Sequence, residues 1–218
     1  MAESHAPSLF APKGQWRDPM IQYDSGPLKA RLRRGTGTMH RKEIRRIARH
    51  TFASQQSNED SWYRSAISFH EGANILWRHE DSIPLGRLVF LMNAALSIEL
   101  LLKAIVVAKG RTPSEHHRLP DLAGDADVAF SMSQRATLEL LGEVLKWSGR
   151  YPVPKKETDW DHYYYHVLER HVIREREGNV GRVRANPETF PSVTNYEALW
   201  DLANRKWDEI QLQPTTEK

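Results

Sequence analysis

Apolar residues recur at helical spacing in five segments of the chain. In each segment they stand three or four positions apart, which is the pattern of a helix that turns one face toward a core. No stretch alternates apolar and polar residues with a period of two for long enough to predict a sheet. The pattern predicts an all-α protein, an up-and-down bundle of four or five helices. The predicted helices span about residues 60–79, 85–109, 134–147, 160–176 and 195–212.

Helix-starting signals precede three of these segments. Ser131 and Gln134 stand in capping-box order before the third segment, and Thr194 and Glu197 do so before the fifth. Thr158, or the residue after it, is expected to open the fourth.

The second segment is apolar enough and long enough to be compared with a membrane span. Arg87, Asn93, Glu99 and Lys103 interrupt it, however, and an ionised pair near the middle of a bilayer is costly. A helix that is apolar on most sides is also expected at the centre of a bundle. We therefore predict a core helix and no membrane partner.

Composition limits the class of protein further. Hydrophobic residues make up 39% of the 218 residues, charged residues 27%, and cysteine is absent. The absence of cysteine excludes a disulfide framework and thiolate metal sites, and it suits a reducing compartment. Since the first residues also lack the pattern of a secretory signal, we expect a cytoplasmic protein.

Positive charge is concentrated near the start of the chain. Residues 28–50 hold nine basic residues and one acidic residue, although the formal net charge of the whole chain is only +3. Residues 1–27 mix proline, glycine and serine without a period. We therefore predict a flexible N-terminal arm over residues 1–50, basic from about residue 28, and a helical bundle over residues 55–212.

The basic run predicts contact with a polyanion. Clustered arginines displace counterions from nucleic acid and bind phosphate with two parallel hydrogen bonds. Aromatic residues are not interleaved, which favours nonspecific contact over base reading. The alternative is a solvated tail that docks on the acidic remainder of the protein. The candidate phosphate-binding residues of the run are Arg31, Arg33, Arg34, Arg41, Lys42, Arg45, Arg46 and Arg49.

Three motifs resemble the HEPN domain family. The segment Ser97–Ala104 reads SIELLLKA, residues 116–122 read HHRLPDL, and residues 147–154 read WSGRYPVP. Their order and spacing resemble the family over roughly residues 60–175. The resemblance implies a bundle of four or five helices, frequent homodimerisation, and a role in RNA cleavage, in nucleotide binding, or as an accessory protein of defence and toxin–antitoxin-like systems.

One departure from the family concerns catalysis. Ribonucleolytic HEPN proteins resemble one another in an Arg-x(4–6)-His element at the start of a late helix. After Arg150 the next histidine is His162, which is too distant for that element. The chain is therefore similar to a divergent or non-ribonucleolytic member, and a ribonuclease activity stays open.

Candidate catalytic groups lie in the first two motifs. Glu99 and Lys103 are one helical turn apart, either as a pair at the rim of the bundle or as an acid–base pair in an inner cleft. His116 and His117 either cap a helix entry or transfer protons.

The third motif supplies the remaining candidates. Arg150, Lys155 and Lys156 flank a proline-stiffened turn that either holds a phosphate and stacks a base or only connects two helices. The spacing of Asp159, His162 and His166 favours an aromatic packing surface over a metal site, and we expect no metal and no cofactor.

Taken together, the sequence predicts a HEPN-like protein that binds RNA or a nucleotide phosphate, with Arg150 also among the catalytic candidates. The first alternative is a noncatalytic module that dimerises or docks a protein partner. The second is a metal-independent endoribonuclease.

Overall fold

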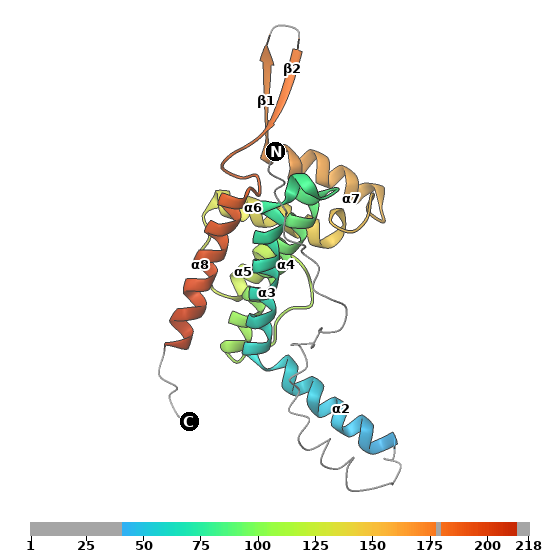
Figure 1. The fold of residues 1–218 in the computed structure, drawn as a ribbon, viewed down its shortest axis with the longest axis vertical. Helices are drawn as coiled ribbons and strands as arrows, with labels where there is room; N and C mark the ends of the chain where they lie inside the picture. The colour runs from blue at the N-terminus through green and yellow to red at the C-terminus, as the bar shows by residue number, and fades with distance from the viewer. Residues whose placement is uncertain (1–40, 178–179, 213–218) are drawn as a thin grey trace, which may run out of the picture. The chain divides into compact units, whose positions relative to one another are not determined.

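The computed structural model describes residues 41–177 and 180–212, and this part of the chain is mostly helical. The all-α class therefore holds for the described residues, apart from one two-stranded sheet. The chain divides into two compact units between Ala48 and Arg49, and the packing described below is that of the second unit. The α-helices are α2 (Arg41–Gln56), α3 (Glu59–Arg78), α4 (Gly86–Ala108), α5 (Leu119–Asp125), α6 (Met132–Glu143), α7 (Glu157–His162) and α8 (Val193–Gln211) (Figure 1).

Shorter elements extend or join these helices. A π-helical turn continues α6, and another continues α7 and leads into a 3-10 turn and a hairpin. The short elements are η2 (Glu80–Ser82), η3 (Val144–Ser148), η4 (Tyr163–Val167), η5 (Leu168–His171), β1 (Val172–Glu177) and β2 (Val180–Ala185).

Helix α4 lies at the centre of the core. It packs against α3, α5, α6 and α8, and nearly every residue from Ala94 to Val107 is buried. Among the described helices it alone is long and apolar enough to cross a membrane, but 67% of that window is buried inside the protein. The absence of an exposed polar stripe is what a central helix requires.

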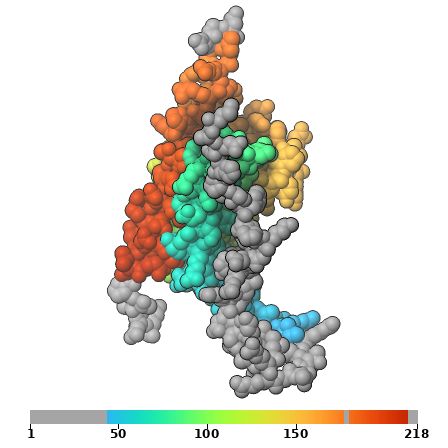
Figure 2. Space-filling model, viewed as in Figure 1, coloured from blue at the N-terminus to red at the C-terminus, as the bar shows by residue number. Residues whose placement is uncertain are grey.

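An aromatic seam joins α3 to α8. Tyr63 stacks on Trp207 with ring centroids 4.4 Å apart, and His70 stacks on Trp200 at 4.0 Å. Figure 2 shows the blue-green surface of α3 beside the red surface of α8. Stacked rings bury large areas and hold the two helices in one register along α4.

The start of α4 requires a glycine. Leu85 precedes the helix in the left-handed region, with a φ of 56°. A Cβ on Gly86 would lie 2.2 Å from the carbonyl oxygen of Glu80, which is closer than any nonbonded contact permits. The turn η2 can therefore pack against the first residue of α4 only if that residue has no side chain.

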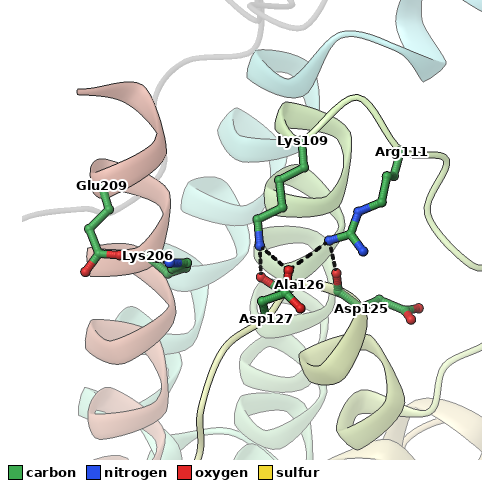
Figure 3. A network of polar contacts seen from close by, with 7 residues as sticks. All are labelled: Lys109, Arg111, Asp125, Ala126, Asp127, Lys206 and Glu209. Carbon is green, nitrogen blue, oxygen red and sulfur yellow. Dashed lines mark hydrogen bonds and ion pairs between the residues drawn. The ribbon is translucent and has the colours of Figure 1, made fainter. Parts of the chain in front are cut away.

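The loop after α4 is clamped to the end of α5 (Figure 3). Lys109 Nζ donates to Oδ2 of Asp127 at 2.9 Å and to the carbonyl of Ala126, while Arg111 donates to the same carboxylate at 3.2 Å and to the carbonyl of Asp125. The hydrogen bond from Lys109, together with both positive charges, lowers the pKa of the Asp127 carboxyl. The clamp holds both ends of the segment that carries the two adjacent histidines.

The fourth predicted helix is wrong at its C-terminal end. The helical segment ends at His171, and residues predicted as helix form β1, which pairs antiparallel with β2 from Val172–Ala185 to Glu177–Val180. The prediction of no sheet fails with it. The residues of β2 are all exposed, so this strand did not need the apolar alternation that would have marked it.

The base of the hairpin is fastened to the helices by hydrogen bonds. Asn186 N donates to the carbonyl of His171 at 2.8 Å, and the Thr189 hydroxyl donates to the carbonyl of Arg170 at 2.9 Å. The Thr137 hydroxyl of α6 donates to the Thr189 carbonyl at 2.9 Å.

The predicted caps had mixed outcomes. The Ser131–Gln134 capping box is present. Thr194 does not cap α8, because Ser192 accepts from the backbone of Asn195 instead and the helix starts two residues earlier than predicted. Nor does Thr158 open α7, whose N-cap is Lys156 without a side-chain hydrogen bond.

Candidate functional site

Glu99, Lys103 and His117 meet in one cluster of charged and polar groups. Lys103 Nζ lies 2.6 Å from Oε1 of Glu99, and His117 Nδ1 lies 2.9 Å from Oε2. The Glu99 and Lys103 side chains are only 5% and 8% exposed, whereas His117 is 48% exposed. The carboxylate therefore joins a buried ammonium group to an imidazole that reaches solvent.

Helical spacing on α4 and the packing of α5 against it together explain how these groups meet. Glu99 and Lys103 are four residues apart on α4, so they lie on one face. His117 stands two residues before α5, whose first turn is held by the fully buried Leu119. Burial of that leucine against the core brings the preceding backbone to the middle of α4.

The contact with Glu99 also determines which nitrogen of His117 is available. A carboxylate only accepts hydrogen bonds, so Nδ1 carries the proton in this contact. Nε2 is then the basic atom of the neutral ring. A histidine oriented by a carboxylate in this way is a proton acceptor with a fixed direction.

His117 lines a cavity of about 870 Å³ between α5, α6, the end of α7 and η5. Three histidines line it, together with four cations and three acids. The histidines are His116, His117 and His162; the cations are Arg118, Arg135, Lys146 and Arg170; the acids are Asp121, Glu139 and Glu143.

Most of these charges neutralise one another. Arg118 lies 2.9 Å from Asp121, and Arg170 lies 2.6 Å from Glu139. Lys146 lies 3.7 Å from Glu143 and 3.8 Å from Asp159, which are long distances for an ion pair. Each acid of the lining therefore has a basic partner.

Arg135 is the exception among the cations that line this cavity. It is exposed, and its Nε donates to the carbonyl of Phe130 at 3.3 Å. Within the described part of the chain it has no acidic partner. Its guanidinium keeps donors that can bind an incoming anion in a bidentate manner.

Sequence reasoning missed the α6 side of this cavity. Arg135, Glu139, Glu143 and Lys146 recur at spacings of four, four and three, which places them on one helical face. That charged stripe is legible in the sequence, but a stripe of mixed charge is ordinarily a solvated face. Only the approach of α5 and Arg170 makes it a cavity wall.

The structure separates the other candidates from the cluster. His116 lines the same cavity, but its Nδ1 accepts from the backbone of Arg118 at 3.3 Å, as a helix-entry histidine does. Arg150 donates to the carbonyls of Leu145 and Lys146 at 2.6 and 3.0 Å, and it does not line this cavity. The prediction that Arg150 acts beside these histidines has no geometric support.

The two lysines after Arg150 also lie elsewhere. Lys155 lines a second, smaller cavity, and Lys156 is the exposed N-cap of α7. Arg150 covers the end of η3, the turn that continues α6, which is the connecting role that the sequence left open for this turn.

The basic segment is described only in part. Arg31, Arg33 and Arg34 lie outside the described residues. Arg41 and Lys42 are the first two residues of α2. The side chains of Arg45, Arg46 and Arg49 on the same helix are exposed. This part of the basic run is helical, since α2 extends from Arg41 to Gln56.

No group of three histidine, aspartate or glutamate side chains within residues 41–177 and 180–212 has the arrangement of a metal site. His162 and His166 face one another with ring centroids 5.5 Å apart. The neighbouring rings of Trp147, Trp160 and Tyr163 pack together at 5.1–5.8 Å, which makes this region an aromatic cluster.

No family model, curated protein or solved structure was found that matches this chain. The class that the described residues define is a mostly helical protein with a carboxylate-bound histidine at the edge of a charged cavity. The HEPN resemblance stays a prediction of the sequence.

Proposed function

We propose that this protein is a HEPN-like bundle that binds the phosphate of RNA or of a nucleotide in the cavity beside His117. The observation that carries the proposal is the pairing pattern of the cavity. Arg118 and Arg170 are each held by an acid, whereas Arg135 keeps its guanidinium without an acidic partner in the described chain. A phosphate would supply the missing partner.

The basic segment before residue 50 has a supporting role in this proposal. Its clustered arginines would attract RNA nonspecifically, with an affinity that falls steeply with salt. The cavity would hold one phosphate in a defined place. The two contributions separate experimentally, because only the first depends on many weak contacts.

Binding of a fluorescein-labelled single-stranded RNA decamer and of adenosine monophosphate tests this proposal. Arg135→Ala in the full-length protein is expected to weaken both by about ten- to a hundredfold, the usual loss of a charge-assisted hydrogen bond. Arg205→Ala is the matched control, because it removes the same charge from an exposed site on α8 outside the cavity.

Three outcomes are informative. Loss in Arg135→Ala alone supports the cavity as the phosphate site. If the two variants and the parent protein bind RNA with equal affinity, RNA binds outside the cavity, through the basic residues before residue 50. No binding by any form would exclude the proposal and leave the noncatalytic partner-docking role.

A second candidate function rests on the tautomer of His117. With Nδ1 bound to Glu99, Nε2 can accept the proton of a ribose 2′-hydroxyl as its oxygen attacks the adjacent phosphorus. The bond to the 5′-oxygen then breaks, that oxygen takes a proton, and a 2′,3′-cyclic phosphate and a 5′-hydroxyl result. Such cleavage needs no metal ion.

Incubation of labelled RNA with the protein in excess EDTA tests this second function. We expect His117→Ala to reduce cleavage by about a hundredfold or more, the usual contribution of general acid–base catalysis. His79→Ala, an exposed histidine outside the cavity, is the control. RNA that binds the parent protein but stays intact would make this a binding protein only.

A further inference from the structure

The turn after α6 borders a second cavity of about 440 Å³. Its lining combines aromatic and proline rings with two ammonium groups, from Trp147, Tyr151, Pro154, Lys146 and Lys155, together with Val153 and Asp159. Lys146 also lines the first cavity. The two cavities therefore share one cationic side chain as a common wall.

Tyr151 places an exposed aromatic ring at this cavity. The residue is 52% exposed although its ring is large and apolar. Its backbone is held, because Tyr151 N donates to the carbonyl of Trp147 at 2.8 Å and Pro152 follows directly. The guanidinium of Arg150 lies 5.6 Å from the ring centroid. A ring held in this way loses little freedom when another ring stacks on it.

Trp147 forms a rigid wall of the same cavity. It is 6% exposed, and its Nε1 donates to Glu143 at 2.9 Å. Tyr163 packs edge-on against it, with ring centroids 5.1 Å apart. The cavity therefore has a fixed indole on one side and an exposed phenol ring on another.

The charges indicate what kind of ring would bind. Lys155 is exposed and has no acidic partner within the described residues, and Lys146 has only the long ion pairs given above. A planar group that carries negative charge at its edge satisfies both features, and a nucleotide of a single strand is such a group. An uncharged aromatic ligand would leave both ammonium groups unused.

We propose that this second cavity is a nucleobase subsite for single-stranded RNA, with the base stacked on Tyr151 and the strand crossing Lys146 toward the first cavity. This inference rests on the proposed function, because the phosphate of the adjoining nucleotide is placed beside Arg135. It assigns a binding role to the turn through Tyr151 and Lys155. Arg150 is a positioning residue that holds the turn to the end of α6.

Three variants of the full-length protein test the subsite with the fluorescein-labelled RNA decamer. Tyr151→Ala is expected to weaken binding by roughly five- to a hundredfold, the range measured for one base–aromatic stack. Tyr151→Phe keeps the ring and is expected to bind like the parent protein. Tyr165→Ala is the control, since Tyr165 is 73% exposed and lines neither cavity.

A decamer of abasic riboses separates stacking from structure. It keeps every phosphate and lacks every base, so the parent protein and Tyr151→Ala should bind it equally. Lys155→Ala should make the negative slope of log affinity against log salt shallower by about 0.7, which is the contribution of one phosphate contact to a single strand.

The outcomes distinguish this inference from the proposed function. If Arg135→Ala weakens binding of the RNA decamer and Tyr151→Ala does not, the subsite is refuted and phosphate binding stands. If Tyr151→Ala weakens the abasic decamer as much as RNA, the residue acts through the fold and the stacking role is refuted. If Arg135→Ala leaves RNA affinity unchanged, the proposed function fails, and a strand entering from the first cavity is refuted with it.

Discussion

Two lysine–glutamate pairs on helices of this protein differ mainly in their surroundings. Glu99 and Lys103 on α4 are 5% and 8% exposed and lie 2.6 Å apart. Lys206 and Glu209 on α8 are 32% and 62% exposed and lie 3.0 Å apart (Figure 3). Both pairs join neighbours one helical turn apart, so the covalent geometry that brings them together is nearly the same.

The difference lies in what replaces a lost partner. On α8, water solvates whichever charge is left, and the pair contributes little. On α4 a single remaining charge stays buried, which is costly in a low-dielectric interior. The buried pair has a third member as well, because Glu99 also receives a hydrogen bond from His117. The buried pair thus belongs both to the core and to the candidate site.

The largest effect is expected from breaking the buried pair. Lys103→Ala leaves Glu99 without its ammonium partner, and we expect a loss of about 3–5 kcal/mol in the free energy of unfolding. Urea denaturation followed by circular dichroism measures it. The double change Glu99→Gln with Lys103→Met removes both charges and should recover part of that loss. A loss below about 1 kcal/mol for Lys103→Ala would show that the buried carboxylate is satisfied by other groups.

A smaller loss is expected from a buried contact without charge. The Tyr196 hydroxyl lies 2.7 Å from His70 Nδ1 and 2.8 Å from Ser97 Oγ. Tyr196→Phe leaves both partners without that contact, and we expect a loss of about 1–3 kcal/mol by the same measurement. Tyr164→Phe removes a hydroxyl from a ring that is 42% exposed and should have no measurable effect. Equal losses in the two variants would contradict the role of burial.

Burial also predicts a dependence on pH that no exposed histidine should show. His171 is fully buried, and burial lowers its pKa below 6.5. Below pH 6.5 the unfolded chain then binds a proton that the folded protein does not. The free energy of unfolding therefore decreases as the pH is lowered from 6.5 to the pKa of the folded state. Above pH 6.5 both states are neutral at this residue and it adds no slope.

Urea unfolding at pH 7.5, 6.0 and 5.0 measures this effect. His171→Gln, whose amide can still donate to the carbonyl of Thr189, should lose less stability between pH 7.5 and 5.0 than the parent protein does. His79→Ala is the exposed control and should follow the parent. The prediction fails if the His171→Gln protein loses as much stability as the parent.

The smallest effect is expected for the exposed pair. Lys206→Ala removes an ion pair at the surface of α8, and the change in the free energy of unfolding should stay within about 0.5 kcal/mol. In 1 M sodium chloride the substitution should cause no additional change in the free energy of unfolding, because salt already screens the ion pair. A loss comparable to that of Lys103→Ala would remove the contrast between the two pairs.

Local sequence determined the positions of the helices. Apolar spacing, with the capping signals, placed α3, α4, α6 and α8 within a few residues of their observed bounds, because the period of a helix is a property of the chain itself. The Ser131 cap was legible for the same reason, since both partners lie within one turn. The apolar content of α4 predicted its central position, and its burial confirms it.

The tertiary structure alone determined the site and the hairpin. His117 meets Glu99 across 18 residues of chain, and only the packing of α5 on α4 sets that distance. Arg150 donates to the carbonyls of Leu145 and Lys146 in η3, because the last turn of a helix leaves carbonyl groups without backbone donors, so its charge is not available to the cavity beside His117. The hairpin escaped prediction because its strands are largely exposed, and a strand that buries no apolar face has no period to read. Helical spacing is recorded residue by residue, whereas the cavity beside His117 exists only where α5, α6 and Arg170 meet.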